Sequence, residues 1–536
     1  MQQLDYIVIG SGSAGAIVAA RLSEDPDVRV LLLEAGGTDR KQILRRPGMI
    51  SILHQIKELK AKYDWGYKTA PQRHMSGRRL NYTRGRVLGG CSSVNGMLYL
   101  RGNRQNYDDW AAAGCEGWDY DSVLPYYRRL EDHEDGASKY HGAGGPVAVT
   151  RHPEIGRVSQ AFMEAVEDVY GLPILDDFNG ERQEGASTYQ MTARDGVRYS
   201  TAEAYIHPNE DRPNLQVELG AQVRRIIVED GRAVGVRFLQ DRKLRVARAS
   251  REIILAAGAI GSPQILMLSG IGPAEHLEDK GIEVVTDLPG VGQNLHDHLF
   301  VPMTYRAPES GHRGTPAHFF GGMLREVVRG KTWFGRTVFE SGAFLKSDDS
   351  QRIPNLQFHT LPWGYPEPNQ DGDERAYVDE GYCYTVMPTL IYPKSRGSVR
   401  LETSNPDDAP IIDPNFLAEP EDLHTLVRGM RMARDLLRSP KIASYIHEEL
   451  APGVHSASDD ELADEVRLRA TTVYHPVGTC KMGVDEGAVV DPQLRVHGVE
   501  GLRVADASIL PSITGGNTNG PSMLIGERCA GLIRGD

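Results

Sequence analysis

The first 37 residues constrain the fold more than any other part of this chain. A short apolar run with β-branched members, residues 4–9, stops at the sequence Gly-Ser-Gly-Ser-Ala-Gly, residues 10–15. Small residues with helical periodicity follow over 16–22, and a second apolar run, 28–33, ends on Glu34. This order of strand, glycine-rich turn, helix, strand and acid is typical of a dinucleotide-binding βαβ unit. A glycine turn alone would be weak support, but here every flanking element is in place.

Each residue type in this unit has a physical role. Gly10 permits the tight turn, Gly12 lets backbone N–H groups approach a pyrophosphate, and Gly15 lets the helix pack closely on the strand. The positive end of the helix dipole then faces the phosphates. The carboxylate of Glu34 is placed to bind ribose hydroxyls and disfavours a 2′-phosphate, so we do not expect NADP. This stretch does not separate FAD from NAD, and an ordinary βαβ unit without ligand is the alternative.

Length and composition exclude several classes of protein. At 536 residues and 59.1 kDa the chain is long enough for two domains. Its net charge of −13 and pI near 5.8 argue against nucleic acid as a partner. No apolar run approaches the roughly 18 residues of a membrane span, and the first strand starts so early that we expect no signal peptide. The five cysteines are scattered without a CxxC pair, which predicts reduced thiols, no zinc site and a cytoplasmic location.

Periodicity predicts the elements of the rest of the chain. Short alternating runs at 215–219, 223–229 and 233–239 predict a small antiparallel layer. The apolar run before Gly258 has the form of a strand that returns to the nucleotide. Two polar stretches read as loops, 132–145 and 363–380. Helical patterns occupy 106–130 (in segments), 158–170, 200–206, 263–269, 421–437, 459–468 and 521–533.

Six motifs, in the same order, resemble those of the glucose–methanol–choline (GMC) oxidoreductases over nearly the whole chain. The first is the glycine-rich turn with Glu34. The others are GRVLGGCSSVN at 85–95, GAIGSPQILMLSGIG at 258–272, VGQNLHDH at 291–298, YHPVGTCKMG at 474–483 and DASILPSITGGNTNGPSMLIGE at 506–527. The resemblance is strongest to the choline dehydrogenase-like branch, which includes bacterial aliphatic alcohol dehydrogenases.

This resemblance implies an α/β fold (α+β overall) with two domains. A Rossmann-like FAD-binding domain would comprise 1–155, 195–306 and 464–536. A substrate-binding domain built on an antiparallel sheet with helices would comprise 156–194 and 307–463. The resemblance also implies oxidation of an alcohol to an aldehyde or ketone. An NAD enzyme is excluded mainly by the later motifs, because the βαβ unit alone fits either nucleotide.

The same resemblance assigns FAD to residues in these motifs and their neighbours. They are Gly10, Ser11, Gly12, Ser13, Ala14, Gly15, Glu34, Ala35, Trp65, Arg86, Val87, Gly89, Gly90, Asn95, Gly96, Met97, Val223, Ala257, Gly258, Asp506, Ala507, Asn517 and Thr518. Asp506 resembles the acid that contacts the ribityl region of the flavin, although a carboxylate that ends a strand can also be a cap.

The way in which the flavin is held also follows from a motif. Some choline oxidases attach it covalently through a histidine in the segment Gly-Gly-Cys-Ser-Ser-X-Asn. Here the X position is Val94, whose isopropyl group cannot form that bond. Cys91 lies nearby, but the family does not use its place in the motif for attachment. We therefore expect FAD to be bound without a covalent link.

Two residues match the catalytic positions of the family. Alcohol oxidation removes a hydroxyl proton and transfers a hydride to flavin N5, and a neutral histidine, with an unperturbed pKa of about 6.5, suits the base role. His475 matches the catalytic histidine, and Pro476 restricts its backbone to extended conformations. Asn517 can bond the substrate oxygen but cannot act as a base, so that role falls to His475 alone. Glu340 and His359 lie in segments that resemble pocket-lining strands.

Several alternatives stay open from the sequence. Hydroxynitrile lyases share this fold and keep a redox-idle flavin; a fatty-acid photodecarboxylase also shares it but does not need the His–Asn pair. A non-catalytic flavin protein is disfavoured by the complete motif around His475. His296, Asp297 and His298 could be mistaken for metal ligands, but adjacent strand residues point to opposite faces and no third-ligand pattern appears, so we expect no metal.

Three properties cannot be read from the sequence. The first is the identity of the alcohol, because the substrate domain carries no motif that indicates specificity. The second is the electron acceptor, which could be a quinone, a dye or oxygen. The third is the oligomeric state. Peripheral contact with a membrane also stays open.

Overall fold

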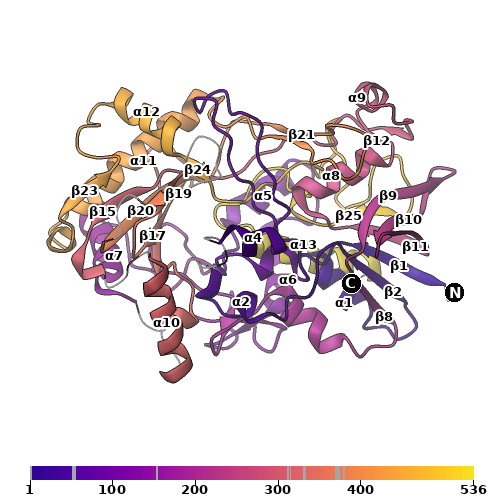
Figure 1. Ribbon diagram of the computed structural model, residues 1–536, viewed down its shortest axis with the longest axis horizontal. Helices are drawn as coiled ribbons and strands as arrows, with labels where there is room; N and C mark the ends of the chain where they lie inside the picture. Colours follow the sequence, from indigo (N-terminus) through magenta and orange to yellow (C-terminus); the bar gives the residue numbers. More distant parts are fainter. Residues whose placement is uncertain are drawn as a thin grey trace.

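The computed structural model describes residues 3–50, 53, 56–152, 155–310, 313, 315–329, 333–368, 375–377 and 381–535 (Figure 1). Two large sheets organise the chain, one toward each end of the long axis. The sheet on the right of Figure 1 contains the first strands of the chain, and the sheet on the left is covered by α7 and α11, with α12 packed on α11.

The first sheet has seven strands in the order β8-β2-β1-β11-β10-β9, with β25 paired to β11 off this path. β8, β2, β1, β11 and β25 are parallel neighbours, whereas β10 and β9 continue from β11 as an antiparallel extension. The bounds are β1 (Leu4–Ile9), β2 (Val30–Glu34), β8 (Leu215–Leu219), β9 (Gln222–Glu229), β10 (Arg232–Gln240), β11 (Lys243–Leu255) and β25 (Leu502–Val504).

The predicted βαβ unit is confirmed, with α1 (Gly15–Leu22) between β1 and β2. The prediction for 215–219 is wrong, because β8 is not part of the antiparallel layer but the parallel neighbour of β2. An alternating run fits a half-buried edge strand as well as a hairpin strand, and only its partner decides which. The runs at 223–229 and 233–239 form an antiparallel pair as expected.

The two ends of the chain lie against each other at the glycine-rich turn. α1 packs on α13 (Asn519–Arg534). A Cβ at Gly526 would lie 2.6 Å from the carbonyl oxygen of Ala14, so a larger residue would push the two helices apart. The hydroxyl of Ser13 donates to Asn519 Oδ1 at 2.7 Å. The start of α13 is therefore fixed beside the N-terminal turn.

The second sheet has eight strands in the order β23-β15-β20-β17-β16-β5, with β14 and β24 joined at β20. All its neighbours are antiparallel. An apolar core joins this sheet to α7 and α11, which lie over it with Phe162 and Leu426 fully buried. The bounds are β5 (Gly185–Thr188), β14 (Leu299–Phe300), β15 (Met303–Arg306), β16 (Ser341–Leu345), β17 (Leu356–Leu361), β20 (Cys383–Leu390), β23 (Glu448–Ala451) and β24 (Thr471–Thr472).

Most expected helices are present. The helix expected over 263–269 begins earlier, at Gly258, directly after β11. The segment 200–206 forms a π-helical turn, η2 (Ala202–Ile206), followed by the 3₁₀ turn η3 (His207–Asn209). The helices that match the expected ones are α5 (Arg104–Ala112), α6 (Tyr120–Leu130), α7 (Arg157–Tyr170), α8 (Gly258–Leu268), α11 (Pro420–Arg438), α12 (Asp459–Arg469) and α13.

The two stretches predicted as loops contain short strands. β3 (Glu131–His133) overlaps the start of the first and pairs with β4 (Val147–Val149). In the second, β18 (Pro366–Pro368) pairs with β19 (Arg375–Tyr377), and residues 369–374 and 378–380 lie outside the described residues. Three-residue strands in polar sequence leave too short a pattern to detect.

The remaining elements are short, except for the 14-residue helix α10. Among the described residues, no helix combines the length and apolar character needed to cross a membrane. These elements are α2 (Gln42–Arg45), α4 (Lys57–Tyr63), α9 (Ala274–Asp279), α10 (Pro316–Arg329), β6 (Ala193–Arg194), β7 (Val197–Arg198), β12 (Ile271–Gly272), β13 (Thr286–Asp287), β21 (Ser398–Arg400), β22 (Ile411–Asp413), η1 (Gly90–Ser93), η4 (Pro308–Ser310), η5 (Trp333–Gly335), η6 (Ala443–Tyr445) and η7 (Ala507–Ile509).

Candidate active site

A cavity of about 1660 Å³ is lined by residues of both sheets. On one side are the carboxyl ends of β1 and β2 and the residue after β11, represented by Ile9, Glu34 and Ala256. On the other side are β17 and β20, represented by His359 and Met387. Ligands of open α/β sheets bind at the carboxyl ends of parallel strands. The cavity therefore joins the predicted nucleotide site to the second sheet in one space.

The three glycines of the N-terminal turn have different surroundings. A Cβ on Gly15 would lie 2.0 Å from the carbonyl oxygen of Gly10. Gly10 has a φ of +95°, and a Cβ there would lie 2.5 Å from the carbonyl oxygen of Ala256. A Cβ on Gly12 would meet no atom within 4 Å, and Gly12 lines the cavity. Gly10 and Gly15 thus serve the packing of the turn, whereas Gly12 leaves an open cradle that fits a dinucleotide phosphate.

Glu34 is fixed beside this cradle. Its carboxylate accepts hydrogen bonds from the backbone N–H and the hydroxyl of Ser11, at 3.0 and 2.6 Å, and from the N–H of Gly36 at 2.7 Å. Burial raises the pKa of Glu34, and these donors oppose that effect. Carboxylate oxygens have lone pairs for more than one donor each. Glu34 can therefore accept further hydrogen bonds from ribose hydroxyls.

Asp506 lines the cavity at the other side of the turn region. It accepts hydrogen bonds from the N–H groups of Gly258 and Ser508, both at 2.8 Å, and from the hydroxyl of Ser262. The bond from Ser508 caps the 3₁₀ turn η7. Burial raises the pKa of Asp506. Asp506 therefore has both roles that the sequence left open, because its carboxylate caps η7 after the strand and also lines the cavity.

Most of the other residues assigned to FAD line this cavity. Trp65 and Arg86 line it together, with the guanidinium carbon of Arg86 4.8 Å from the centre of the Trp65 ring. The remaining lining residues of the set are Gly10, Ser13, Ala14, Ala35, Gly90, Asn95, Gly96, Met97, Val223, Ala257, Gly258, Ala507, Asn517 and Thr518.

Four assigned residues do not line the cavity: Ser11, Gly15, Val87 and Gly89. The hydroxyl of Ser11 is turned to Glu34 and accepts from the N–H of Gly89 at 3.3 Å. Val87 is fully buried in an apolar cluster with Val94. Ser11 and Val87 therefore contact the residues around the cavity and do not face the cavity itself.

His475 is held by contacts on three sides. Its Nε2 lies 3.2 Å from the amide nitrogen of Asn517, and its Nδ1 lies 3.0 Å from Nδ1 of His298. Its backbone N–H donates to Asp297 Oδ1 at 2.8 Å, and the hydroxyl of Thr472 donates to the other oxygen of that carboxylate. His475 and Asn517 both line the cavity. The two residues predicted to be catalytic, 42 positions apart in sequence, are therefore neighbours.

Burial controls the charge of this group. It lowers the pKa of His475 well below 6.5, and the positive charge of Arg84 lowers it further. Burial also lowers the pKa of His298 to about 3 and that of His359 to about 4. The three imidazoles are therefore neutral at pH 7. Burial raises the pKa of Asp297 to about 6.

The expectations for the second sheet have different outcomes. His359 lines the cavity, is buried, and has its Nδ1 3.2 Å from the hydroxyl of Thr389. Glu340 is buried but does not line the cavity, because its carboxylate accepts from the N–H of Gly156 at 2.9 Å. The sequence placed both in pocket-lining strands, but Glu340 lies just before β16 (Ser341–Leu345) and its carboxylate turns to the start of α7.

Sequence reasoning missed two residues that position His475. It placed Asp297 and His298 in the motif at 291–298 and weighed them against a metal site, but assigned them no contact with His475, whereas they hold its backbone and its imidazole ring. The signals in the sequence were that motif and its cluster of titratable residues at 296–298. Its partner lies 177 positions further along the chain, a separation that no local pattern reveals.

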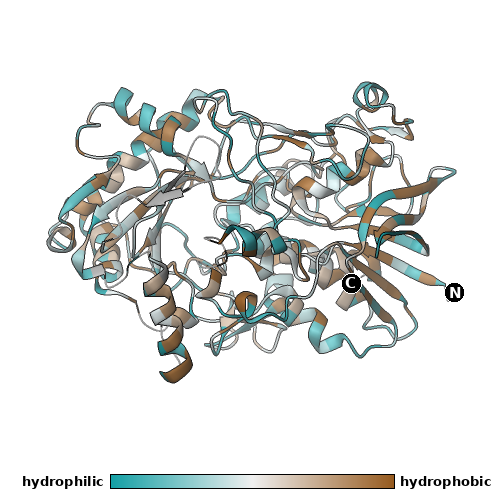
Figure 2. Cartoon of the chain, in the orientation of Figure 1, coloured by the Kyte–Doolittle hydropathy of each residue, from teal (hydrophilic) through white to brown (hydrophobic). Residues whose placement is uncertain are grey.

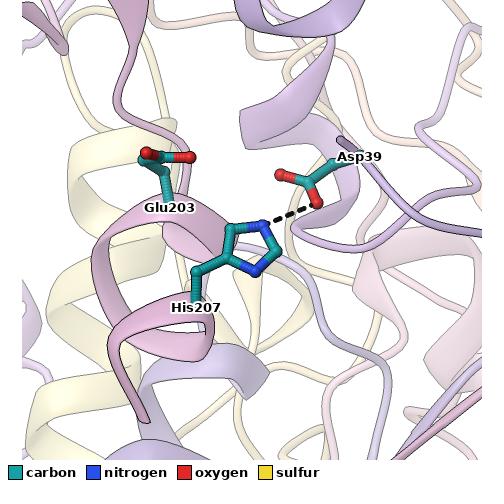
Figure 3. A group of neighbouring side chains, drawn as sticks. All are labelled: Asp39, Glu203 and His207. Atoms are coloured by element: carbon teal, nitrogen blue, oxygen red, sulfur yellow. Dashed lines mark hydrogen bonds and ion pairs between the residues drawn. The ribbon is translucent and has the colours of Figure 1, made fainter. Parts of the chain in front are cut away.

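One group of possible metal ligands does occur among the described residues. Figure 3 shows Asp39, Glu203 and His207, with His207 Nε2 2.9 Å from Asp39 Oδ1. Glu203 pairs with Arg45 at 2.9 Å, and Arg40 lies 3.4 Å from the other ring nitrogen of His207. Each carboxylate already has a basic partner, His207 for Asp39 and Arg45 for Glu203, and Arg40 itself binds Glu210 at 2.6 Å. We therefore interpret the group as an ion-pair network outside the cavity.

Comparison with known proteins establishes the family. Family models described as GMC oxidoreductase match residues 4–300 and 393–526. The chain therefore belongs to the GMC oxidoreductases, as its motifs predict, and the predicted fold class is confirmed. FAD is the cofactor of this family, and the cradle at Gly12 fits it. FAD-dependent alcohol oxidation is the activity that membership supports, and a lyase is not favoured.

Individual relatives cover almost the whole chain. An alcohol dehydrogenase (acceptor) from Pseudomonas putida is 40% identical, with 99% of this chain and 95% of the relative covered. The mitochondrial choline dehydrogenase of Homo sapiens is 42% identical over 99% and 90%. Among solved structures, pyridoxine 4-oxidase from Mesorbium loti has 31% identity, a TM-score of 0.89 and full coverage of both chains. Formate oxidase of Aspergillus oryzae has 27% identity and a TM-score of 0.88, with 100% and 98% covered.

Proposed function

We propose that this chain oxidises an alcohol to an aldehyde or ketone at the cavity wall formed by His475 and Asn517. The observation that carries this proposal is the 3.2 Å separation of His475 Nε2 and Asn517 Nδ2 in a cavity shared with the glycine cradle. An amide donor and an imidazole acceptor side by side can bind one hydroxyl group through its oxygen and its proton.

FAD, when bound, supplies the hydride acceptor. In this proposal Gly12 gives the pyrophosphate access to backbone N–H groups, Glu34 binds a ribose, and Asp506 contacts the ribityl region. Trp65, Arg86 and the other lining residues named above complete the site. Val94 lines the cavity at the position where some choline oxidases carry a histidine, so we propose that the flavin is held without a covalent bond.

His475 acts as the base because it is neutral. Its pKa lies well below 6.5, so at pH 7 one ring nitrogen carries a lone pair in place of a proton. The 3.0 Å contact between the Nδ1 atoms of His475 and His298 has room for one proton, which one ring donates to the other. The backbone groups of Thr514 and Ile391 raise the pKa of His298 against the larger effect of burial, and so favour a proton on that ring. We propose that the other nitrogen of His298 accepts from His475, which leaves Nε2 of His475 to take the hydroxyl proton.

Asp297 fixes the backbone of this base. It bonds the N–H of His475, where Tyr474 adopts a φ of +65° and Pro476 follows. Asn517 stands at the start of α13, whose N-terminal dipole favours negative charge nearby. The amide thus orients the substrate oxygen while His475 removes its proton.

The domain division and the location also remain proposals. We propose the division given above with two boundaries moved, because residues 299–306 and 471–472, which it assigns to the FAD-binding domain, pair in the second sheet and belong with the substrate-binding domain. A cytoplasmic location is supported by five free cysteines, four of them buried. The alcohol and the final acceptor, whether quinone, dye or oxygen, are left to experiment.

An anaerobic screen tests the proposed function. The holoenzyme is mixed with a panel of alcohols while the flavin absorbance is followed, and air or a dye is then admitted. We expect at least one alcohol to bleach the flavin. Reoxidation by air then identifies oxygen as an acceptor, whereas reoxidation only by a dye or quinone identifies a dehydrogenase. Cleavage of a cyanohydrin without bleaching by any alcohol would instead support the lyase.

A further inference from the structure

Helix α10 presents an apolar stripe to solvent. Phe320, Leu324, Val327 and Val328 are 61, 57, 78 and 74% exposed. Their spacing of four, three and one places them on one face of the helix. Figure 2 shows strong hydrophobic colour on this helix, which extends beyond the rest of the fold at the lower edge of the view.

The opposite side of α10 is anchored to the protein. Phe319 is fully buried, and its ring meets that of Trp363 edge-on at 5.3 Å between centroids. Met323 packs partly buried against the same apolar cluster. Since α10 already has a core-facing side, the exposed stripe is a second apolar face on a helix of 14 residues. Apolar side chains grouped in this way mark an interaction surface.

Positive charge flanks the stripe although the whole chain carries a net charge of −13. Arg325 and Arg329 are exposed on α10 itself. Arg313, shortly before the helix, is also exposed, with its guanidinium carbon 4.5 Å from the centre of the Tyr382 ring. Glu326 is only partly exposed, with its carboxylate beside Gly335. An apolar stripe with cationic neighbours is the pattern of helices that lie in the headgroup region of an anionic bilayer.

The stripe is continuous with the cavity. Ala317 and Phe320 line the cavity, and Phe320 is also the first residue of the exposed stripe. The cavity is also lined by Ile56, which is 41% exposed, and by Lys57 and Lys60 of the α4 region. A surface that receives α10 would therefore lie beside an opening with the same combination of apolar and cationic side chains.

We propose that α10 docks this enzyme on an anionic phospholipid bilayer. Phe320, Leu324, Val327 and Val328 enter the boundary between headgroups and acyl chains, and Arg325 and Arg329 bind lipid phosphates. A second copy of the chain fits less well, because a two-fold contact brings the same patch onto itself and would set arginines against arginines. The proposal goes beyond the oxidation described above and does not depend on it.

Vesicle co-sedimentation of the holoenzyme tests this docking. We expect binding to phosphatidylcholine vesicles that contain phosphatidylglycerol, and much weaker binding to phosphatidylcholine alone or at high salt. The variant L324S/V327S/V328S should lower the partition coefficient at least about tenfold. The variant R325Q/R329Q should lower it about fivefold for each arginine removed at low salt. None of these five residues lines the cavity, so oxidation with a water-soluble dye should be unchanged.

A matched control and two outcomes make the test decisive. The control L244S/V246S removes side chains that are 62 and 49% exposed on β11, and it should bind vesicles as the wild type does. Equal vesicle binding by the wild type and both α10 variants would overturn the proposal. A second result would also overturn it. If the wild type is a dimer in sedimentation velocity without lipid, and L324S/V327S/V328S is a monomer that binds vesicles as the wild type does, the stripe is the contact with a second copy.

Discussion

Removing the imidazole of His475 should abolish most of the flavin reduction. Loss of a general base typically costs two to four orders of magnitude, or about 2.7–5.4 kcal/mol at 1.36 kcal/mol per tenfold. His298 lies next to His475 but does not line the cavity, so its ring does not reach a substrate there. His359 does line the cavity, and because its Nδ1 is engaged with Thr389 its Nε2 keeps a lone pair that can accept a proton. We therefore expect His475→Ala to be about 10²–10⁴-fold slower, the full range for loss of a general base.

The assay is anaerobic stopped-flow reduction of the flavin by a saturating alcohol. FAD content, measured from the flavin absorbance, should remain near one per chain, because the cradle at Gly12 and Glu34 is built from other elements. His276→Ala is the control, since His276 is also buried but lies on α9 and does not line the cavity. If His475→Ala retained FAD and reduced it at the wild-type rate, the base assignment would be refuted. If the alanine variant loses FAD, the same measurement is made on His475→Gln, which keeps a polar side chain at this position.

Further predictions concern the substrate amide, the flavin link and the cradle. Asn517→Ala should slow flavin reduction but keep the pH profile of the wild type. In that profile the rate falls only below pH 6.5, because burial lowers the pKa of His475 and the base must be neutral. If the variant lost this fall in rate at low pH, the fall could not be assigned to His475. Acid precipitation should leave a colourless pellet and a yellow supernatant, and a protein mass increased by one FAD would show a covalent link. Gly12→Ala should keep the melting temperature of the apoprotein but bind FAD about ten- to hundredfold more weakly in a titration, since overpacking by a methyl group costs about 1–3 kcal/mol. Gly37→Ala also meets no atom within 4 Å and lies outside the cavity, so it should bind FAD normally.

The sequence alone determined the nucleotide-binding unit and the amphipathic helices. The requirements at Gly10, Gly12 and Gly15 arise within a few residues of the turn or from the strand beside it, so the spacing carries them. The helices at 158–170 and 421–437 were predicted nearly to their ends for the same reason, because the periodicity of one face is a local property. The long motifs gave the family and the pair His475 and Asn517.

Only the tertiary structure decided which segments meet. The run 215–219 has the same pattern whether it pairs in a parallel or an antiparallel layer, and its neighbour β2 settles the matter. The support of His475 by His298 and Asp297, the different directions of Glu340 and His359, and the exposed second face of α10 also depend on partners far away in sequence. A pattern records what a segment can bury or bond, whereas the identity of the partner depends on how the whole chain packs.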